Sequence, residues 1–270
     1  MKRPGWIEDA ADRLDRAEKY RTQTGLLSLA NPEMSMDDAY AVQSAWIKRK
    51  LATGETTIGW KIGLTSRAMQ QALNIDVPDS GVLLDSMWFE DGSTIPARRF
   101  IQPRVEAEIA FVMKKPLSGL NLSIDAVLDA TDYVAPALEI LDTRIVRADA
   151  ATGRMRNFCD TIADNAANAG IVLGKHRADP ETLDLRWIGA IVSRDGVIEE
   201  TGLGAGVLGH PATSVSWLAA RLTQYGHQIE PGQIILSGSF IRPIECPLGT
   251  DIHADFGQFG TVGCHFAKED

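Results

Sequence analysis

Two glutamates separated by a single residue are the first feature of this chain that could do chemistry. Glu106 and Glu108 lie in residues 104–112, which read RVEAEIAFV. Alternate residues of a strand point to the same face, so the two carboxylates would stand side by side. A divalent cation relieves both their mutual repulsion and the cost of burying them, and carboxylate oxygens suit Mg²⁺ or Mn²⁺. The alternative is a solvated strand face, but the apolar flanks favour the metal.

A third carboxylate lies alone in an apolar segment. Glu139 occurs within residues 135–141, which read APALEIL. A charge in such a segment is seldom buried unless it is paired or binds a metal. Glu139 is therefore the predicted third ligand, and three carboxylates on one octahedral ion would leave roughly three positions for water or an organic acid. A buried ion pair with Arg104 or Arg144 is the alternative.

Two further charged residues could take part in catalysis. Lys61 lies between Gly59 and Gly63 in a short predicted strand, and glycines beside a polar strand residue permit the close approach of a ligand. Lys61 could bind an anion or transfer a proton; the alternative is a surface lysine whose ammonium group reaches solvent. Asp79 lies in a predicted turn-rich loop, residues 76–81, and could act as a general base. The alternative for Asp79 is a turn-forming or capping residue.

Other polar groupings point less clearly to chemistry. Residues 161–168, which read TIADNAAN, could orient water or substrate, or could form caps and turns. Asp251, His253 and Asp255 share a strand face and could hold a transition metal, but their segment resembles a solvated strand edge. The glycine-rich residues 202–209 lack the ending of a phosphate-binding loop, which favours flexibility or tight packing. No GxSxG sequence supports a serine hydrolase.

The elements that must position these residues begin with helices at residues 9–20 and 35–51, the second opened by a capping box of Ser35 and Asp38. Further helices are predicted at residues 66–73, 124–130 and 211–225. Strands are predicted at residues 57–63, 99–113, 133–142, 187–193, 197–201, 233–240 and within 250–266. Strands and helices do not alternate as they do in a doubly wound sheet. The predicted fold class is α+β: a helical N-terminal segment, residues 1–55, and one compact β-rich catalytic domain, residues 56–270.

Composition narrows the classes of partner. The 270 residues include 36 acidic and 27 basic ones, a net charge of −9, which argues against nucleic acid or an anionic membrane as the main partner. No apolar run of about 18 residues is present, so no membrane span is predicted. The basic N-terminus is not followed by an apolar stretch, as a signal peptide would require. The three cysteines form neither a disulfide framework nor a CxxC metal motif, and we expect a reducing cytoplasm.

Several segments together resemble the hydratases of aromatic meta-cleavage pathways, a family within the fumarylacetoacetate hydrolase superfamily. The resemblance runs from about Gly59 to Phe266. It is carried by residues 59–66 (GWKIGLTS), 76–85, 103–108 (PRVEAE), 130–139 (ATDYVAPALE), 160–170, 185–187 (LRW) and 238–243 (GSFIRP). The combination is highly specific. One departure is Trp60, where tyrosine is expected, and it leaves Lys61 in place.

The resemblance implies a site and an assembly. It implies that the metal, Mg²⁺ or Mn²⁺, is bound by Glu106, Glu108 and Glu139, with Lys61 and Asp79 acting catalytically beside it. Substrate contacts are expected from Leu84, Thr161, Ser239 and Arg242. A β-rich, sandwich-like fold and a symmetric homo-oligomer larger than a dimer are also implied.

The implied reaction is hydration of a 2-hydroxy-dienoate or its 2-oxo tautomer to a 4-hydroxy-2-oxo acid. A seven-carbon diacid would need a second anion site, and arginine suits bidentate carboxylate recognition. The candidates are Arg144, Arg147, Arg154, Arg156 and Arg242. The alternatives are a mono-acid substrate, decarboxylation on the same metal scaffold, C–C bond hydrolysis and a catalytically silent binding partner. The acidic triad argues against a catalytically silent protein, and the absence of a convincing His–Glu pair argues against C–C bond hydrolysis.

Overall fold

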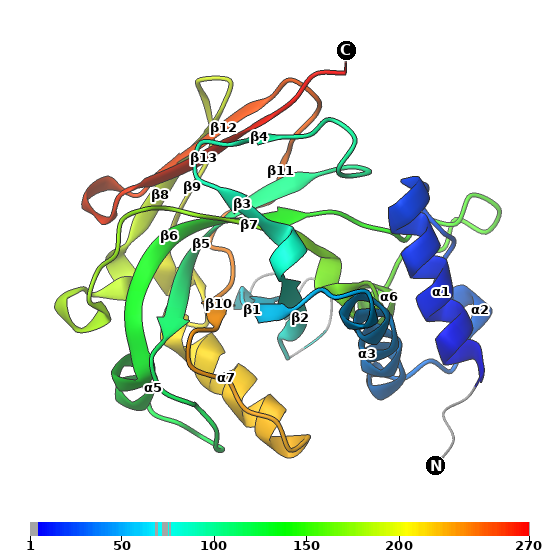
Figure 1. Cartoon of the computed structure of the whole chain (residues 1–270), viewed down its shortest axis with the longest axis horizontal. Helices are drawn as coiled ribbons and strands as arrows, with labels where there is room; N and C mark the ends of the chain where they lie inside the picture. Colours follow the sequence, from blue (N-terminus) through cyan, green and yellow to red (C-terminus); the bar gives the residue numbers. More distant parts are fainter. Residues whose placement is uncertain (1–4, 68–69, 72–74, 76, 270) are drawn as a thin grey trace.

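The computed structural model describes residues 5–67, 70, 71, 75 and 77–269. Figure 1 shows a strongly curved large sheet at the centre, a smaller sheet above it, and helices to the right and below. The α+β class and the helical N-terminal segment predicted from the sequence are confirmed. In the described part of the chain, no helix combines the length and the apolar character that crossing a bilayer requires.

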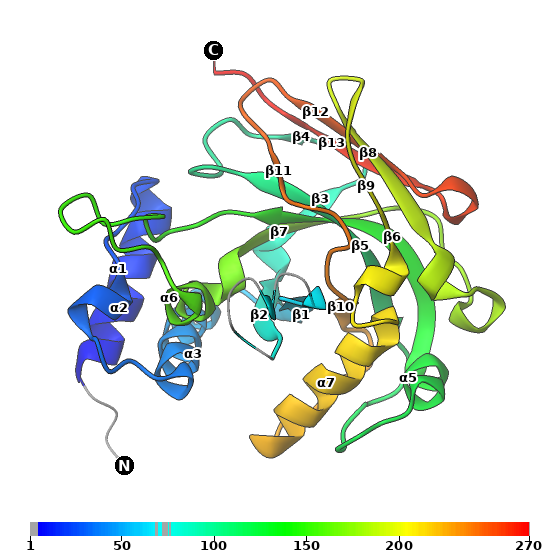
Figure 2. The same cartoon turned by 180° about the vertical axis from the view of Figure 1, so that it is seen from behind.

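The N-terminal helices share an apolar cluster with a helix from the middle of the chain. These helices are α1 (Gly5–Tyr20), α2 (Leu27–Ala30), α3 (Met36–Ala52) and α6 (Phe158–Ala163). Figure 2 shows α6 beside α3 from the opposite side of the molecule. At the start of α3, Ser35 and Asp38 form the predicted capping box, each side chain accepting a backbone N–H of the other residue. The packing attaches the N-terminal helices to the sheet region that follows α6.

The large sheet contains the chain segments that the sequence assigned to chemistry. Its strands are β1 (Thr57–Gly63), β2 (Asp79–Leu84), β3 (Trp88–Glu90), β5 (Arg104–Met113), β6 (Thr131–Leu141), β7 (Asn168–Leu173), β10 (Ile234–Leu236) and β11 (Ile244–Glu245). The strand order is β2-β1-β10-β5-β6-β7-β3, and β11 pairs with the beginning of β5. The long antiparallel pair β5–β6 therefore lies at the centre of the sheet.

Strand β5 separates two environments. Val105, Ala107 and Ile109 are fully buried in the main apolar core, as the alternation of the sequence predicted. That core also includes side chains of the small sheet, of α5 (Ile124–Ala130) and of α7 (Pro211–Gln224). The intervening residues Glu106 and Glu108 point to the other face. One strand thus contributes to the core and to the site at the same time.

The small sheet covers the large one on its core side. Its strands are β4 (Thr94–Ile95), β8 (Gly189–Arg194), β9 (Val197–Leu203), β12 (Asp251–Asp255) and β13 (Thr261–Phe266), in the order β4-β13-β12-β8-β9. The predicted hairpin between β8 and β9 is present, with Asp195 and Gly196 both at positive φ in its turn. Gly202 and Gly204 belong to a tightly packed region, because an added Cβ would lie 1.9 Å from the Phe240 oxygen and 2.1 Å from the Leu185 oxygen.

Several predicted boundaries are wrong, for identifiable reasons. β5 begins at Arg104 rather than at residue 99, because the N–H groups of Ile101 and Gln102 donate to the Asp142 carboxylate instead of to a strand. β10 ends at Leu236 rather than at residue 240, because the chain bends at Gly238, whose φ is 113°. β8 begins at Gly189 because the preceding residues form a short 3₁₀ helix, Leu185–Trp187. Half of the predicted helix at residues 66–73, namely residues 68, 69, 72 and 73, lies outside the described residues.

Candidate metal centre

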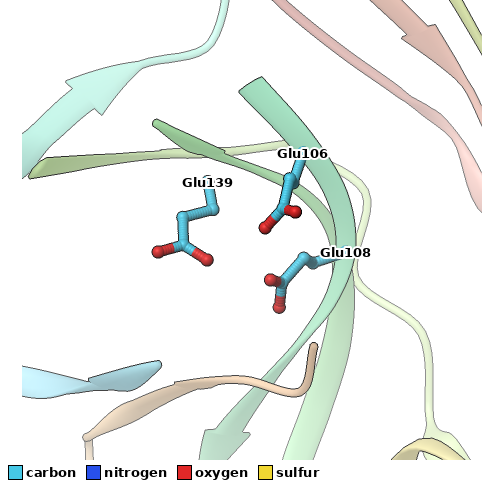
Figure 3. A group of neighbouring side chains, drawn as sticks. All are labelled: Glu106, Glu108 and Glu139. Atoms are coloured by element: carbon cyan, nitrogen blue, oxygen red, sulfur yellow. The ribbon is translucent and has the colours of Figure 1, made fainter. Parts of the chain in front are cut away.

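The pairing of β5 with β6 brings three glutamates together. Glu106 lies directly opposite Glu139 in the register, and Glu108 is two residues further along the same face of β5. Figure 3 shows the three side chains pointing toward one another. One carboxylate oxygen from each lies within 4.8 Å of the others. In the part of the chain that the structure describes, this is the one group of at least three acidic, histidine or cysteine residues with metal-ligand geometry.

The three carboxylates lie where charge is costly. Glu108 and Glu139 are completely buried, and Glu106 is half-buried. Burial, followed by the charge of Glu139, raises the pKa of Glu106 to about 7. Burial and the charges of Glu139 and Glu106 raise the pKa of Glu108 well above its usual value. Without a cation the cluster therefore retains protons near neutral pH, and a divalent ion would relieve both causes of the shift.

Hydrogen bonds orient these carboxylates and leave two oxygens over. Glu108 Oε2 accepts the Gly238 N–H at 2.7 Å, and Glu139 Oε1 accepts the Asn168 Nδ2–H at 2.8 Å. Glu108 Oε1 and Glu139 Oε2 are buried without a hydrogen-bond partner among the described residues. Buried oxygens of this kind normally have a partner. These two carboxylate oxygens come from two neighbouring strands, and as hard ligands they fit a cation such as Mg²⁺ or Mn²⁺.

Lys61 lies on β1 with its ammonium group against the triad. It is 3% exposed, so the alternative of a surface lysine is wrong. Its Nζ lies 3.3 Å from Glu139 Oε1 and donates to the Ala166 carbonyl at 3.1 Å. Burial opposes the charged form, but the carboxylates of Glu139 and Asp79 outweigh it and raise the pKa of Lys61. The partner of Glu139 in this structure is therefore a lysine, and the predicted alternative of an arginine partner is wrong.

Asp79 is the first residue of β2, so its predicted loop position is wrong. It lies opposite Gly63 in the antiparallel pair of β1 and β2. A Cβ added at Gly63 would lie 2.3 Å from Asp79 Oδ1 and 2.9 Å from Lys61 Nζ, so glycine is required for the two charged groups to approach. Burial raises the pKa of Asp79, which favours a proton-carrying carboxyl, although Lys61 acts in the opposite direction. Its Oδ1 has no hydrogen-bond partner in the described residues.

Two residues beside Asp79 were not found from the sequence. The Tyr40 hydroxyl accepts the N–H of Ser80 at 3.2 Å, and burial together with the charge of Asp79 raises the pKa of Tyr40. The Arg221 guanidinium lies 3.6 Å from the centre of the Tyr40 ring. Tyr40 comes from α3 and Arg221 from α7, two helices far apart in the sequence. No local sequence pattern connects them to the site, and only the packing of the helices places them there.

The expected substrate contacts are distributed unevenly around the triad. Ser239 follows Gly238, and its hydroxyl contacts the Ala107 carbonyl on β5 at 3.4 Å. Leu84 is buried in a separate apolar cluster, and the Thr161 hydroxyl donates to the carbonyl of Asn157, the N-cap residue of α6. Arg242 is exposed and pairs with Glu200. The structure thus brings Ser239 close to the strand that carries the triad, and it gives no contact between the triad and the other three among the described residues.

The structure also shows the positions of the candidate arginines and of the second candidate metal site. Arg144 is 1% exposed and forms a buried ion pair with Asp164, so its guanidinium is already occupied. Arg147 and Arg156 line a separate cavity of about 880 Å³ that also contains Arg104. Arg154 is exposed. Asp251, His253 and Asp255 are exposed along β12, so the predicted solvated face is present. The predicted edge position is wrong, because β12 pairs with β13 on one side and with β8 on the other.

Comparison with known proteins gives the family. No family model matches the chain. It is 54% identical over 256 residues to the 2-oxo-hept-4-ene-1,7-dioate hydratase of Escherichia coli, covering 95% of this chain and 96% of that protein. It is 39% identical over 263 residues to a 2-keto-4-pentenoate hydratase of Paraburkholderia xenovorans (strain LB400), covering 97% and 96% of the two chains.

A solved structure agrees over almost the whole chain. The 4-oxalocrotonate decarboxylase from Pseudomonas putida G7, complexed with magnesium and adipate, is similar with a TM-score of 0.91 and 32% identity, covering 98% of both chains. The relatives define a lyase. Its fold is shared with a yeast fumarylacetoacetate hydrolase family protein, with a TM-score of 0.56 at 16% identity. The chain belongs to the family of these hydratases and decarboxylases of aromatic catabolism, as the sequence segments predicted.

Proposed function

We propose that this protein is a Mg²⁺- or Mn²⁺-dependent hydratase of 2-oxo-hept-4-ene-1,7-dioate, a seven-carbon diacid of homoprotocatechuate catabolism. The observation that carries the metal dependence is the convergence of Glu106, Glu108 and Glu139, with one oxygen from each within 4.8 Å. The identity of 54% to a hydratase of that name supports the choice of substrate. A cytoplasmic homo-oligomer larger than a dimer is part of the same proposal.

The proposed metal ligands are the three glutamates of the triad. The unpartnered oxygens of Glu108 and Glu139 are the ones available to a cation, while Gly238 and Asn168 hold the opposite oxygens. When bound, the ion would act as a Lewis acid on the carboxylate and 2-oxo group of the substrate and favour its enolate form. The residues of this chain then have to bind the acid, move protons and supply water at the correct carbon.

Asp79 and Lys61 have separate roles in the proposed reaction. In the dienol form, the hydroxyl proton at C2 is lost and a proton is added at C5, which leaves a 2-oxo acid with a double bond between C3 and C4. Water then adds its oxygen to C4 and a proton to C3, giving the 4-hydroxy-2-oxo acid. The Asp79 carboxyl is buried, and its Oδ1 has no hydrogen-bond partner in the described part of the chain; it is the proposed proton carrier. The Lys61 ammonium group is the proposed partner of the developing negative charge on the substrate.

The proposed substrate contacts differ in how much rearrangement they need. Ser239 adjoins Gly238, which binds Glu108, and its hydroxyl would have to exchange the Ile241 carbonyl, to which it donates at 2.9 Å, for the substrate. Arg242 would have to exchange Glu200 for the distal carboxylate of the substrate. Leu84 and Thr161 are retained only as contacts implied by the family resemblance.

Decarboxylation is the second candidate function. It is favoured by one specific finding, the TM-score of 0.91 to a 4-oxalocrotonate decarboxylase over 98% of both chains. The same triad could serve there, because loss of CO₂ also leaves an enolate that a bound cation stabilises. The two reactions differ in their products, so they can be separated directly.

The deciding experiment compares three acids with the purified protein, with Mg²⁺ and with EDTA. The acids are 2-hydroxyhepta-2,4-diene-1,7-dioate, the mono-acid 2-hydroxypenta-2,4-dienoate and 4-oxalocrotonate. We expect metal-dependent loss of dienol absorbance with the highest kcat/KM for the diacid, and no CO₂ release. A preference for the mono-acid would overturn the substrate assignment, and CO₂ release from 4-oxalocrotonate would favour the decarboxylase.

A further inference from the structure

Three consecutive residues beside the metal centre have left-handed backbone conformations. Asn165, Ala166 and Ala167 have φ values of 53°, 52° and 62°, and none of them is glycine. They form a short 3₁₀ turn, Asn165–Ala167, between α6 and β7. A left-handed conformation is unfavourable for an L-residue and normally occurs as a single residue. A run of three persists only where the surrounding structure holds it in place.

The side chain of Asn165 holds this left-handed turn in place. Its Oδ1 accepts the Val82 N–H at 2.8 Å, and its Nδ2–H donates to the Val82 carbonyl at 2.9 Å. The amide therefore pairs with β2 as a neighbouring strand would, and it is completely buried. Gly81 permits this approach, because an added Cβ there would lie 2.4 Å from the Asn165 carbonyl oxygen. Both hydrogen bonds bind the turn to the strand that begins with Asp79.

The turn contacts the lysine and the acidic triad. The Ala166 carbonyl accepts a hydrogen bond from Lys61 Nζ at 3.1 Å, and the next element begins with Asn168, which donates to Glu139 Oε1. An ammonium group has three N–H donors. Ala166 and Glu139 engage two of them, and the third has no partner among the described residues. The left-handed turn thus fixes the direction of the remaining donor.

We propose that Asn165 is a positioning residue for Lys61, acting through the left-handed turn and the Ala166 carbonyl. It holds the ammonium group so that one N–H is directed to the bound acid substrate. This inference rests on the proposed function, because that function gives Lys61 its role. It does not require Asn165 to touch metal or substrate, and it assigns a reason to the backbone strain.

The test uses Asn165→Gly, which tolerates positive φ and removes both hydrogen bonds to Val82. The matched control is Asn121→Gly, an exposed asparagine that also has positive φ, 56°, outside the site. Because a displacement of about 1 Å can cost about 100-fold in rate, we expect Asn165→Gly to lower kcat by about that factor. Mn²⁺ affinity and KM should be unchanged, and Asn121→Gly should behave as the wild type. A crystal structure of Asn165→Gly should show that the Lys61–Ala166 hydrogen bond is broken.

Three results would overturn the inference: an unchanged kcat, a loss of kcat matched by an equal loss of Mn²⁺ affinity, or a preserved Lys61–Ala166 contact in the variant. A wild-type protein without turnover on any of the acids would refute the proposed function instead. In that case the crystal structures of wild type and variant with Mn²⁺ and oxalate decide the inference on their own. A Lys61 ammonium group that moves in the variant supports it, and an unmoved one rejects it.

Discussion

Replacing Glu106 by glutamine should stabilise the metal-free protein while removing its response to metal. In the folded protein the pKa of Glu106 is raised from 4.5 to about 7 by burial and by Glu139. A carboxyl with a raised folded-state pKa favours folding fully below pH 4.5, and that contribution is lost as the pH rises to about 7. At about pH 8 the ionised side chain therefore costs roughly 3 kcal/mol at most, since it is only half-buried.

The neutral isostere avoids this cost. With EDTA at about pH 8, Glu106→Gln should unfold roughly 5–10 °C above the wild type, a shift that corresponds to that free energy for a chain of this size. The difference should shrink as the pH is lowered through 7 toward 4.5, where the wild-type carboxyl is protonated. Glu33→Gln makes the same chemical change at an exposed position and should leave the unfolding temperature unchanged.

Metal offsets this difference. Mg²⁺ at about 100 times its dissociation constant should stabilise the wild type by about 2.7 kcal/mol, because it binds only the folded state. The variant lacks one of the three carboxylates, so it should gain little and should have no metal-dependent turnover. Thermal unfolding of both proteins with EDTA and with Mg²⁺ measures all four values. A variant less stable than wild type with EDTA, or one that keeps the full response to Mg²⁺, would refute the reasoning.

Four further results are expected. Mg²⁺ affinity should increase as the pH rises through about 7, because Glu106 must release its proton to bind metal. Calorimetry in buffers of different ionisation enthalpy measures the released protons, and a pH-independent affinity would contradict this. Asp79→Asn should lower kcat by about 10²–10⁴-fold without changing Mg²⁺ affinity, and an unchanged kcat would exclude Asp79 from proton transfer. Gly238→Ala should weaken metal binding more than Gly153→Ala, although both glycines have positive φ. Only the Gly238 N–H donates to Glu108, and a Cβ added at Gly238 would lie 2.2 Å from the Thr65 side chain, whereas the space at Gly153 is open. Equal effects of the two substitutions would remove the role given to the Gly238 N–H. Arg144→Met should destabilise the fold by about 3–5 kcal/mol in urea unfolding, because it leaves Asp164 buried and unpaired. The double variant Arg144→Met/Asp164→Leu should recover most of this stability. No recovery would mean that the packing of the Arg144 side chain dominates its contribution.

Much of the site could be predicted from local pattern. The period of two in β5 placed Glu106 and Glu108 on one face and Val105, Ala107 and Ile109 in the core. An isolated charge in an apolar strand marked Glu139, and glycines on both sides marked Lys61. The capping box at the start of α3 was also visible, because it involves only neighbouring residues. Each of these inferences depends on residues close together in the chain, where sequence spacing is a direct measure of geometry.

Pairings across strands were decided only by the tertiary structure. The register of β5 and β6 puts Glu106 opposite Glu139, and the strand order brings Lys61 of β1 to the same carboxylate. The position of Asp79 in β2 rather than in a loop follows from its pairing with Gly63.

The bend at Gly238 and the left-handed turn at Ala166 likewise determine the positions of the Gly238 N–H and the Ala166 carbonyl, which sequence spacing does not predict. By itself, then, the sequence determined the family, the α+β class and the residue types of the site. The fold decided which atoms face one another, because strand register and backbone bends depend on contacts between segments far apart in the chain.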